Sequence, residues 1–246
     1  MTKTLVLIPS RMAATRLPGK PLLKINNLSI VSHVFKKAEE AKIGEVVVAT
    51  GDQEILVDVL KNGGRAILTN KDHKTGTDRI YEAYTKLDLK NVDYILNLQG
   101  DEPDINKDDI INLNNLMINQ DAELGTLAAK IQDDKMMDNR NIVKVITDKK
   151  LTESNFPTVL NFTRDNLSID SQNIYHHIGI YSYKVSVLEK FVSLDQTSNE
   201  KKNKLEQLRA LDNKLKINVA LAKSSPIGVD TTEDYLAIKK IMEYKI

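Results

Sequence analysis

The chain contains no cysteine, which excludes disulfides, thiolate catalysis and a cysteine-based zinc site. It also lacks an excess of either charge, since 35 basic and 34 acidic residues leave a formal net charge of +1. This balance gives no reason to expect nucleic acid or a membrane as a partner. The apolar run at residues 4–8 is too short for a signal peptide or a transmembrane helix, so we expect a cytoplasmic protein.

Hydrophobic residues make up 41% of the 246 residues, which is enough for a substantial core. In the first half of the chain, strand and helix patterns alternate. The predicted strands cover 4–8, 45–50, 66–68 and 92–98, and the predicted helices cover 30–41, 52–62, 78–87 and 107–119. Apolar strands separated by amphipathic helices predict an α/β fold in which a parallel sheet carries helices on both faces.

This alternation breaks after a predicted strand at 124–130. Three more strands are predicted without long helices between them, at 143–147, 159–162 and 178–183. We interpret residues 131–182 as a β-rich insert that serves dimerisation and forms a lid, within a single domain spanning 1–246. The remaining predicted elements are helices at 185–192 and 203–211, a strand at 217–221 and a helix at 233–244.

Residues 9–21 form a basic loop directly after the first predicted strand. Arg11 and Lys20 can meet phosphate oxygens, and Gly19 lets a ligand approach the backbone. Three prolines stiffen the loop, so little entropy is lost when a ligand orders it. An ordinary basic surface loop explains the same residues, and the string matches neither the P-loop nor Gly-x-Gly-x-x-Gly. The sequence suggests no role for Arg16.

Two further polar loops, 70–77 and 99–104, also follow predicted strands. Ligands of α/β sheets bind at the carboxyl ends of the strands, so the three loops predict one site at that edge. Thr75 and Asp78 fit the capping of a helix, which explains much of the first of these loops. Arg79 is different, because a cation in a first helical turn opposes the helix dipole and favours an anionic ligand nearby.

Two aspartates are candidates for holding a hard cation. Asp101 follows a predicted strand, although Gly, Asp and Pro at 100–103 also favour a simple turn. Asp230 precedes the last predicted helix, where Thr231 and Asp234 form a capping box that leaves Asp230 unexplained. Magnesium prefers oxygen ligands and is often held by one or two carboxylates together with substrate phosphates.

Polar side chains in the second half are less specific. His176 and His177 precede an alternating strand, and adjacent strand residues point to opposite sides, so the two cannot share one metal. A strand end that is partly buried explains them equally well. The segment 205–211 has leucines at helical spacing, and a packed helix with solvated polar residues accounts for it.

Several separated strings resemble one enzyme family. Arg-x4-Arg-Leu-Pro-Gly-Lys-Pro at 11–21 resembles the opening of the sugar-acid cytidylyltransferases. His-x-Gly-Ile-Tyr at 177–181, Leu-Glu-Gln-Leu-Arg at 205–209 and Gly-Val-Asp-Thr at 228–231 resemble those members that act on 3-deoxy-manno-octulosonate (Kdo). The resemblance implies a Rossmann-like nucleotidyltransferase fold, a Mg²⁺ cofactor, a homodimer, and transfer of CMP from CTP to Kdo for lipopolysaccharide biosynthesis.

The resemblance also implies residue roles. Arg11 and Lys20 would contact the CTP phosphates and assist catalysis, Thr75 and Gly76 would lie at the cytosine, and Asp101 and Asp230 would bind Mg²⁺. The sugar pocket would be lined by Arg79, Gln99, Arg164, His177, Glu206 and Gln207, with arginine and histidine suiting the sugar carboxylate. One departure concerns Arg164, because the Ile-Pro that usually follows this family string closely is absent here.

Two other readings stay open at this point. The enzyme could be a cytidylyltransferase for another sugar acid, of the 8-amino-Kdo or sialic acid type. It could also be a nucleotide-binding protein without catalytic activity, which the presence of both aspartates disfavours.

Overall fold

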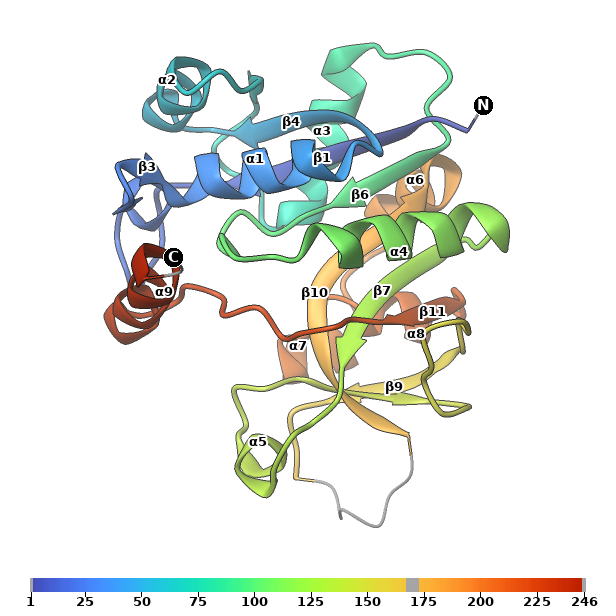
Figure 1. The fold of residues 1–246 in the computed structure, drawn as a ribbon. Helices are drawn as coiled ribbons and strands as arrows, with labels where there is room; N and C mark the ends of the chain where they lie inside the picture. Colours follow the sequence, from blue (N-terminus) through green and yellow to red (C-terminus); the bar gives the residue numbers. More distant parts are fainter. Residues whose placement is uncertain (1, 167–172, 245–246) are drawn as a thin grey trace. The chain divides into compact units, whose positions relative to one another are not determined.

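The computed structural model describes residues 2–166 and 173–244. The chain divides into two compact units, one of Met1–Ile110 with Pro226–Ile246 and the other of Ile111–Ser225 (Figure 1). Throughout the described part, each helix is too short or too polar to cross a bilayer.

The first unit is built on four parallel strands. Their order is β6 (Tyr94–Asn97), β1 (Thr4–Ser10), β4 (Gly44–Thr50) and β5 (Ala66–Leu68). In register, Val6 of β1 lies between Val46 of β4 and Leu96 of β6, and all three side chains are buried. Burial on both faces explains why these strands are apolar almost without interruption. The predicted parallel sheet is confirmed.

Helices connect these strands across both faces of the sheet. Helix α1 (Ile30–Ala41) lies in front of the strands in Figure 1 and α3 (Gly76–Leu87) lies behind them, while α2 (Gln53–Lys61) joins β4 to β5. Helix α1 starts where the sequence predicts, because the Ser29 side chain accepts a hydrogen bond from the Ser32 amide. The connection through α1 leads from β1 to one side and that through α3 leads to β6 on the other, which makes β1 and β6 the switch point of the sheet.

The carboxyl-terminal segment returns to the first unit. Helix α9 (Thr232–Tyr244) packs against a short hairpin of β2 (Lys24–Ile25) and β3 (Leu28–Ser29). Ile25, Val229 and Ile238 are buried together in a small apolar cluster, and the Tyr235 hydroxyl donates to the Lys24 carbonyl at 2.7 Å. This packing fixes the segment just before α9 beside the amino-terminal loops.

The second unit contains an antiparallel framework. Strand β7 (Leu124–Ala129) pairs in parallel with β11 (Ile217–Leu221) and antiparallel with β10 (Ile174–Lys184). Strand β8 (Lys144–Thr147) pairs antiparallel with β10 and with β9 (Val159–Thr163). The predicted β-rich insert therefore contains β8, β9 and most of β10, although residues 167–172 lie outside the described part. Its roles in dimerisation and as a lid stay predictions.

One helix predicted in the second unit differs from the observed structure. Helix α4 (Lys107–Asn119) enters the unit, and α5 (Asp134–Asp138) and α6 (Val185–Ser193) belong to it. The single helix predicted over 203–211 is wrong, because the chain forms α7 (Ser198–Asn203) and α8 (Leu208–Asp212) with a turn between them. Lys204 ends α7 in the left-handed conformation, which interrupts a helix whatever the spacing of the leucines.

Candidate active site

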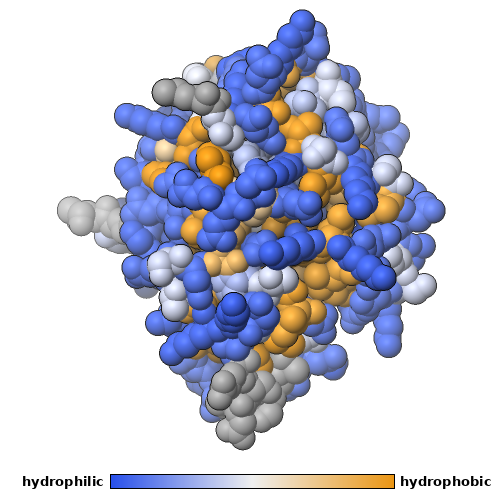
Figure 2. Space-filling model, turned by 90° about the vertical axis from the view of Figure 1, so that its right-hand side faces the viewer, coloured by the Kyte–Doolittle hydropathy of each residue, from blue (hydrophilic) through white to orange (hydrophobic). Residues whose placement is uncertain are grey.

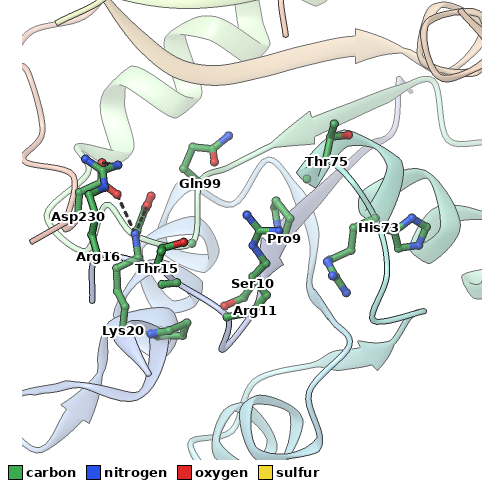
Figure 3. A pocket seen from close by; sticks show the side chains of 17 residues that line it. Pro9, Ser10, Arg11, Thr15, Arg16, Lys20, His73, Thr75, Gln99 and Asp230 are labelled. Carbon is green, nitrogen blue, oxygen red and sulfur yellow. Dashed lines mark hydrogen bonds and ion pairs between the residues drawn. The ribbon is translucent and has the colours of Figure 1, made fainter. Parts of the chain in front are cut away.

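A cavity of about 350 Å³ opens at the carboxyl ends of the strands of the first unit (Figure 3). It is lined by the loop after β1, by the loop that leads into α3, by residues 99–101 after β6, and by Asp230. All of these residues belong to the first unit. The three polar loops singled out in the sequence thus meet at one edge of one sheet, beside its switch point.

Lys20 lies at the centre of an ion-pair cluster in this cavity. Its Nζ is 2.7 Å from Asp101 Oδ2 and 3.2 Å from Asp230 Oδ1. Burial alone would lower the pKa of Lys20, but the two carboxylates outweigh it and raise that pKa, so the ammonium group stays charged. Gly19 adopts the left-handed conformation just before Lys20, at φ 71°, which the glycine tolerates without strain.

Asp101 is set in place by contacts of its neighbours. A Cβ atom added at Gly100 would lie 2.9 Å from the Pro9 carbonyl oxygen, so the glycine allows the loop to pass close to β1. The Val229 amide donates to the Asp101 carbonyl at 2.9 Å. This bond ties the segment of Asp101 directly to that of Asp230, which the sequence separates widely.

Asp230 is positioned by the start of α9. The predicted capping box is present, because the Asp234 amide donates to Thr231 Oγ1 at 3.2 Å and the Thr231 amide donates to Asp234 Oδ2 at 2.9 Å. The Asp230 amide also donates to Asp234 Oδ2, at 3.1 Å, which leaves the Asp230 side chain to face Lys20. Arg16, for which the sequence suggested no role, places Nη2 3.0 Å from Asp230 Oδ2 (Figure 3).

The carboxylates of Asp101 and Asp230 form a donor set that fits a hard divalent cation. Both contact one nitrogen atom, so their oxygens converge on a common point. Among the described residues no group of three or more histidine, cysteine, aspartate or glutamate side chains gathers as a metal cage. Two carboxylates with room for phosphate oxygens and water is the arrangement that Mg²⁺ commonly takes.

Arg11 and Thr75 lie on the side of the cavity away from Asp230 (Figure 3), and Gly76 also lines the cavity. Arg11 directly follows β1, and the next amide, that of Met12, is held by Asp52 Oδ2 at 2.8 Å. Thr75 caps α3 by accepting a hydrogen bond from the Asp78 amide at 3.1 Å, as the sequence predicts. These contacts keep the polar groups at fixed places around the cavity.

Arg79 is buried and has several partners. Its Nη1 donates to Thr69 Oγ1 at 2.6 Å and to the Asn70 carbonyl at 3.0 Å, and its Nη2 donates to the Lys71 carbonyl at 3.3 Å. These bonds brace the loop after β5. The carbonyl groups of Asn70 and Lys71 therefore stabilise the positive charge of Arg79 without an anionic ligand. Arg79 also lines the cavity, as does Gln99.

His73 is a cavity residue that sequence reasoning missed. Its Nε2 pairs with Glu82, which also receives hydrogen bonds from Lys86 and the Asn70 amide. Burial raises the pKa of Glu82, but these hydrogen bonds outweigh it and lower the pKa to about 2. His73 could have been identified from the sequence, because it lies two residues before the capping Thr75 in the same polar loop.

The second unit holds the other predicted sugar residues, and His177 lies at their centre. Its Nε2 lies 3.0 Å from the Tyr181 hydroxyl and 3.1 Å from Thr126 Oγ1, and Phe162 packs edge-on at 5.0 Å. Burial lowers the pKa of His177 to about 3, so the imidazole is neutral at physiological pH. A neutral imidazole can meet a carboxylate by donating a hydrogen bond, so the predicted role of His177 at the sugar stays a prediction.

The charges of Glu206 and Arg164 shift the pKa values of Tyr181 and His177. The charge of Glu206 helps to raise the pKa of Tyr181, after the larger effect of burial. Arg164 contributes to lowering the pKa of His177, and its Nη1 donates to the Asn141 carbonyl at 3.1 Å. Gln207 follows Glu206 at the start of α8. Within the second unit, Arg164 and Glu206 thus both act electrostatically on the pair of His177 and Tyr181, and Gln207 is the chain neighbour of Glu206.

A parallel α/β sheet with a cationic cavity and a carboxylate pair at its switch point defines a nucleotide-binding α/β protein. The chain belongs to the cytidylyltransferase family, whose model matches residues 5–217. A 3-deoxy-manno-octulosonate cytidylyltransferase of Rhodopseudomonas palustris strain BisB18 is 43% identical over 99% of both chains. One of Afipia carboxidovorans is 43% identical over 97% of this chain and 96% of its own length.

Solved structures agree with these relatives. A CMP:2-keto-3-deoxy-manno-octonic acid synthetase complexed with CTP aligns with a TM-score of 0.90 at 31% identity, and the alignment covers all of both chains. A UDP-glucose pyrophosphorylase aligns at 14% identity with a TM-score of 0.74, which shows the fold alone. The predicted Rossmann-like nucleotidyltransferase fold and the predicted enzyme family are confirmed.

Proposed function

We propose that this chain transfers CMP from CTP to the anomeric hydroxyl of Kdo, giving CMP-Kdo and pyrophosphate, and so activates Kdo for lipopolysaccharide biosynthesis. The observation that carries this proposal is the convergence of Asp101 and Asp230 on Lys20 in the cavity at the switch point. The relatives named for this reaction, which match nearly the full length of the chain, support the choice of substrates.

Four residues of the cavity would receive CTP. Arg11 and Lys20 are the cations that would hold the triphosphate and stabilise negative charge as it moves onto the leaving pyrophosphate. Thr75 and Gly76 would lie at the cytosine, where a Cβ added at Gly76 would come 3.2 Å from the Pro9 ring. The hydroxyl oxygen of the sugar would bond to the α-phosphorus while the bond from that phosphorus to pyrophosphate, in line with it, breaks. The hydroxyl proton would pass to solvent, and no covalent enzyme intermediate would form.

Asp101 and Asp230 would hold Mg²⁺, since their oxygens converge and suit that ion. When bound there, Mg²⁺ would lower the pKa of the attacking hydroxyl and offset phosphate charge. Lys20 would then leave the two carboxylates for the phosphates. Arg16 would likewise give up its contact with Asp230.

The residues proposed to bind the sugar are Arg79, Gln99, Arg164, His177, Glu206 and Gln207. His177, being neutral, would act through hydrogen bonds, while arginine would meet the carboxylate. We also retain the homodimer as part of the proposal. Leu160 in the β-rich insert is 60% exposed, and hydrophobic side chains show between hydrophilic ones on the face in Figure 2. The cytoplasm remains the predicted location.

The decisive experiment mixes the protein with CTP, Mg²⁺ and one sugar acid and records pyrophosphate release. We expect release with Kdo, and none when the sugar is omitted. A panel with 8-amino-Kdo and sialic acid separates the proposal from its nearest alternative, because preference for either would contradict the choice of Kdo. If no sugar acid leads to pyrophosphate release, a nucleotide-binding protein without catalytic activity is favoured instead.

A further inference from the structure

The turn that carries Glu206 and Gln207 lies between two very short helices. Helix α7 (Ser198–Asn203) precedes it and α8 (Leu208–Asp212) follows it. Helices of one or two turns are not stable on their own in water, so tertiary contacts must hold this segment in shape. Several of these contacts converge on one buried side chain, that of Arg209.

Arg209 forms a two-pronged ion pair with Glu200. Its Nε donates to Glu200 Oε2 at 2.9 Å and its Nη2 donates to Glu200 Oε1 at 2.6 Å. The two side chains are only 4% and 5% exposed. Glu200 is also the acidic member of the capping box that starts α7 at Thr197. The ion pair therefore joins α7 to α8 across the turn that carries Glu206 and Gln207.

The same guanidinium group has two further neighbours. Its Cζ lies 4.8 Å from the centre of the Phe191 ring on α6. Its Nη2 lies 3.7 Å from Oε1 of Glu206 in the turn. Glu206 in turn acts electrostatically on Tyr181, whose hydroxyl contacts His177. The buried pair is thus linked to the proposed sugar residues by the approach of Arg209 to Glu206 and by the electrostatic effect of Glu206 on Tyr181.

We propose that Arg209 is a positioning residue for the sugar acid. It holds the Glu206 carboxylate at the edge of the Tyr181 and His177 cluster, and Glu200 fixes the fork of Arg209 in the orientation that this requires. The inference rests on the proposed role of Glu206 in sugar binding. A purely structural ion pair would stabilise the fold without influence on how tightly the sugar is bound.

The test must separate positioning from folding. Arg209→Met alone leaves the Glu200 carboxylate buried without its cation, and is expected to unfold the protein. The double variant Glu200→Gln with Arg209→Met removes both charges and keeps a residue type suited to the capping box. The matched control is the double variant Lys184→Met with Asp121→Asn, which removes the exposed pair of the same unit, spaced 2.7 Å.

Initial rates with varied Kdo and varied CTP, together with thermal melting, give the readouts. We expect the Glu200–Arg209 double variant to melt cooperatively, with a KM for Kdo raised about tenfold and an unchanged KM for CTP. Adding Glu206→Gln should raise the KM for Kdo no further, because both changes break the same contact. The control should match the wild type in both constants.

An unchanged KM for Kdo in the folded double variant, or an effect that multiplies with that of Glu206→Gln, would overturn the positioning role. Wild-type protein in the same series tests the proposed function separately. If the wild type releases pyrophosphate and the double variant has a normal KM for Kdo, only the positioning role of Arg209 is rejected. Failure of the wild type to release pyrophosphate rejects both.

Discussion

The Lys20 ammonium group lies 2.7 Å from the Asp101 carboxylate, at the point where the proposed cation would bind. Asp230 contacts the same nitrogen from the other side. The proposed metal ion would therefore compete with a side-chain cation for one pair of carboxylates. Since the phosphates of CTP offer Lys20 another anionic partner, nucleotide and metal should bind cooperatively.

Replacement of Lys20 by methionine should strengthen metal binding in the absence of nucleotide. We expect the affinity for Mn²⁺ alone to rise about tenfold, because the competing ammonium group is removed, while turnover falls. Electron paramagnetic resonance of free Mn²⁺ measures the affinity directly. Lys24→Met changes an exposed lysine of the same segment and serves as the control. An affinity equal to or below the wild type would contradict this competition.

Replacement of either aspartate by asparagine should abolish turnover without unfolding the protein. Asp101→Asn and Asp230→Asn keep the size of the side chain but remove the charge that a divalent ion needs, and we expect a loss of about a thousandfold or more. Pyrophosphate release and thermal melting are the two measurements. Asp72→Asn in an exposed loop is the control. A variant with a near-normal rate would reject the metal assignment.

Arg11→Ala should affect CTP more than Kdo. The side chain lines the cavity at the end of β1, so its loss should raise the KM for CTP about tenfold or more and leave that for Kdo nearly unchanged. Initial rates with each substrate varied in turn give the answer. A defect confined to Kdo would show that Arg11 serves the sugar instead.

Gly100→Ala should disturb the Asp101 loop. The new Cβ would lie 2.9 Å from the Pro9 carbonyl oxygen, which is closer than packing allows, so we expect a destabilisation of about 1–3 kcal/mol and weaker metal binding. Urea denaturation measures the free energy of unfolding. Gly228→Ala is the matched control, since an added Cβ there meets nothing within 4 Å. Equal stabilities of the two variants would argue against the close approach.

The stability contributed by Glu82 should depend on pH. Its pKa is lowered to about 2 in the folded protein from an ordinary value of 4.5, so the carboxylate stabilises the fold above pH 4.5. That contribution is lost as the pH falls from 4.5 towards 2. We expect Glu82→Gln to cost on the order of 1–2 kcal/mol at pH 7 and much less at pH 3. Urea denaturation at both pH values tests this, and a constant difference would contradict it.

Local patterns were enough to predict much of the first unit. The helix Ile30–Ala41 was predicted to the residue, because its apolar spacing and the Ser29 cap act within the segment itself. The helix predicted over 203–211 failed for the opposite reason. There the leucine spacing continues through a turn that is spanned by the side-chain contact between Glu200 and Arg209, nine residues apart. Such a pairing leaves no periodic trace in the sequence.

In the candidate site, too, local patterns predicted some features and missed those that depend on contacts between separated segments. The three loops could be placed at one edge of the sheet, because strand direction alone determines which ends meet. The approach of Asp230 to Asp101 depends on the backbone bond from Val229 and on the packing of α9, which no local pattern encodes. Arg16 also found its partner only through that approach.

The packing of α9 on the hairpin of β2 and β3 has a consequence for how the protein is made. The first unit receives Asp230 from a segment that follows the whole of the second unit in the chain. A nascent chain that stops before the second unit holds Asp101 and Lys20 but lacks Asp230. The carboxylate pair is therefore completed only after the second unit has been synthesised, and a shorter nascent chain would lack one of the two proposed ligands of the cation.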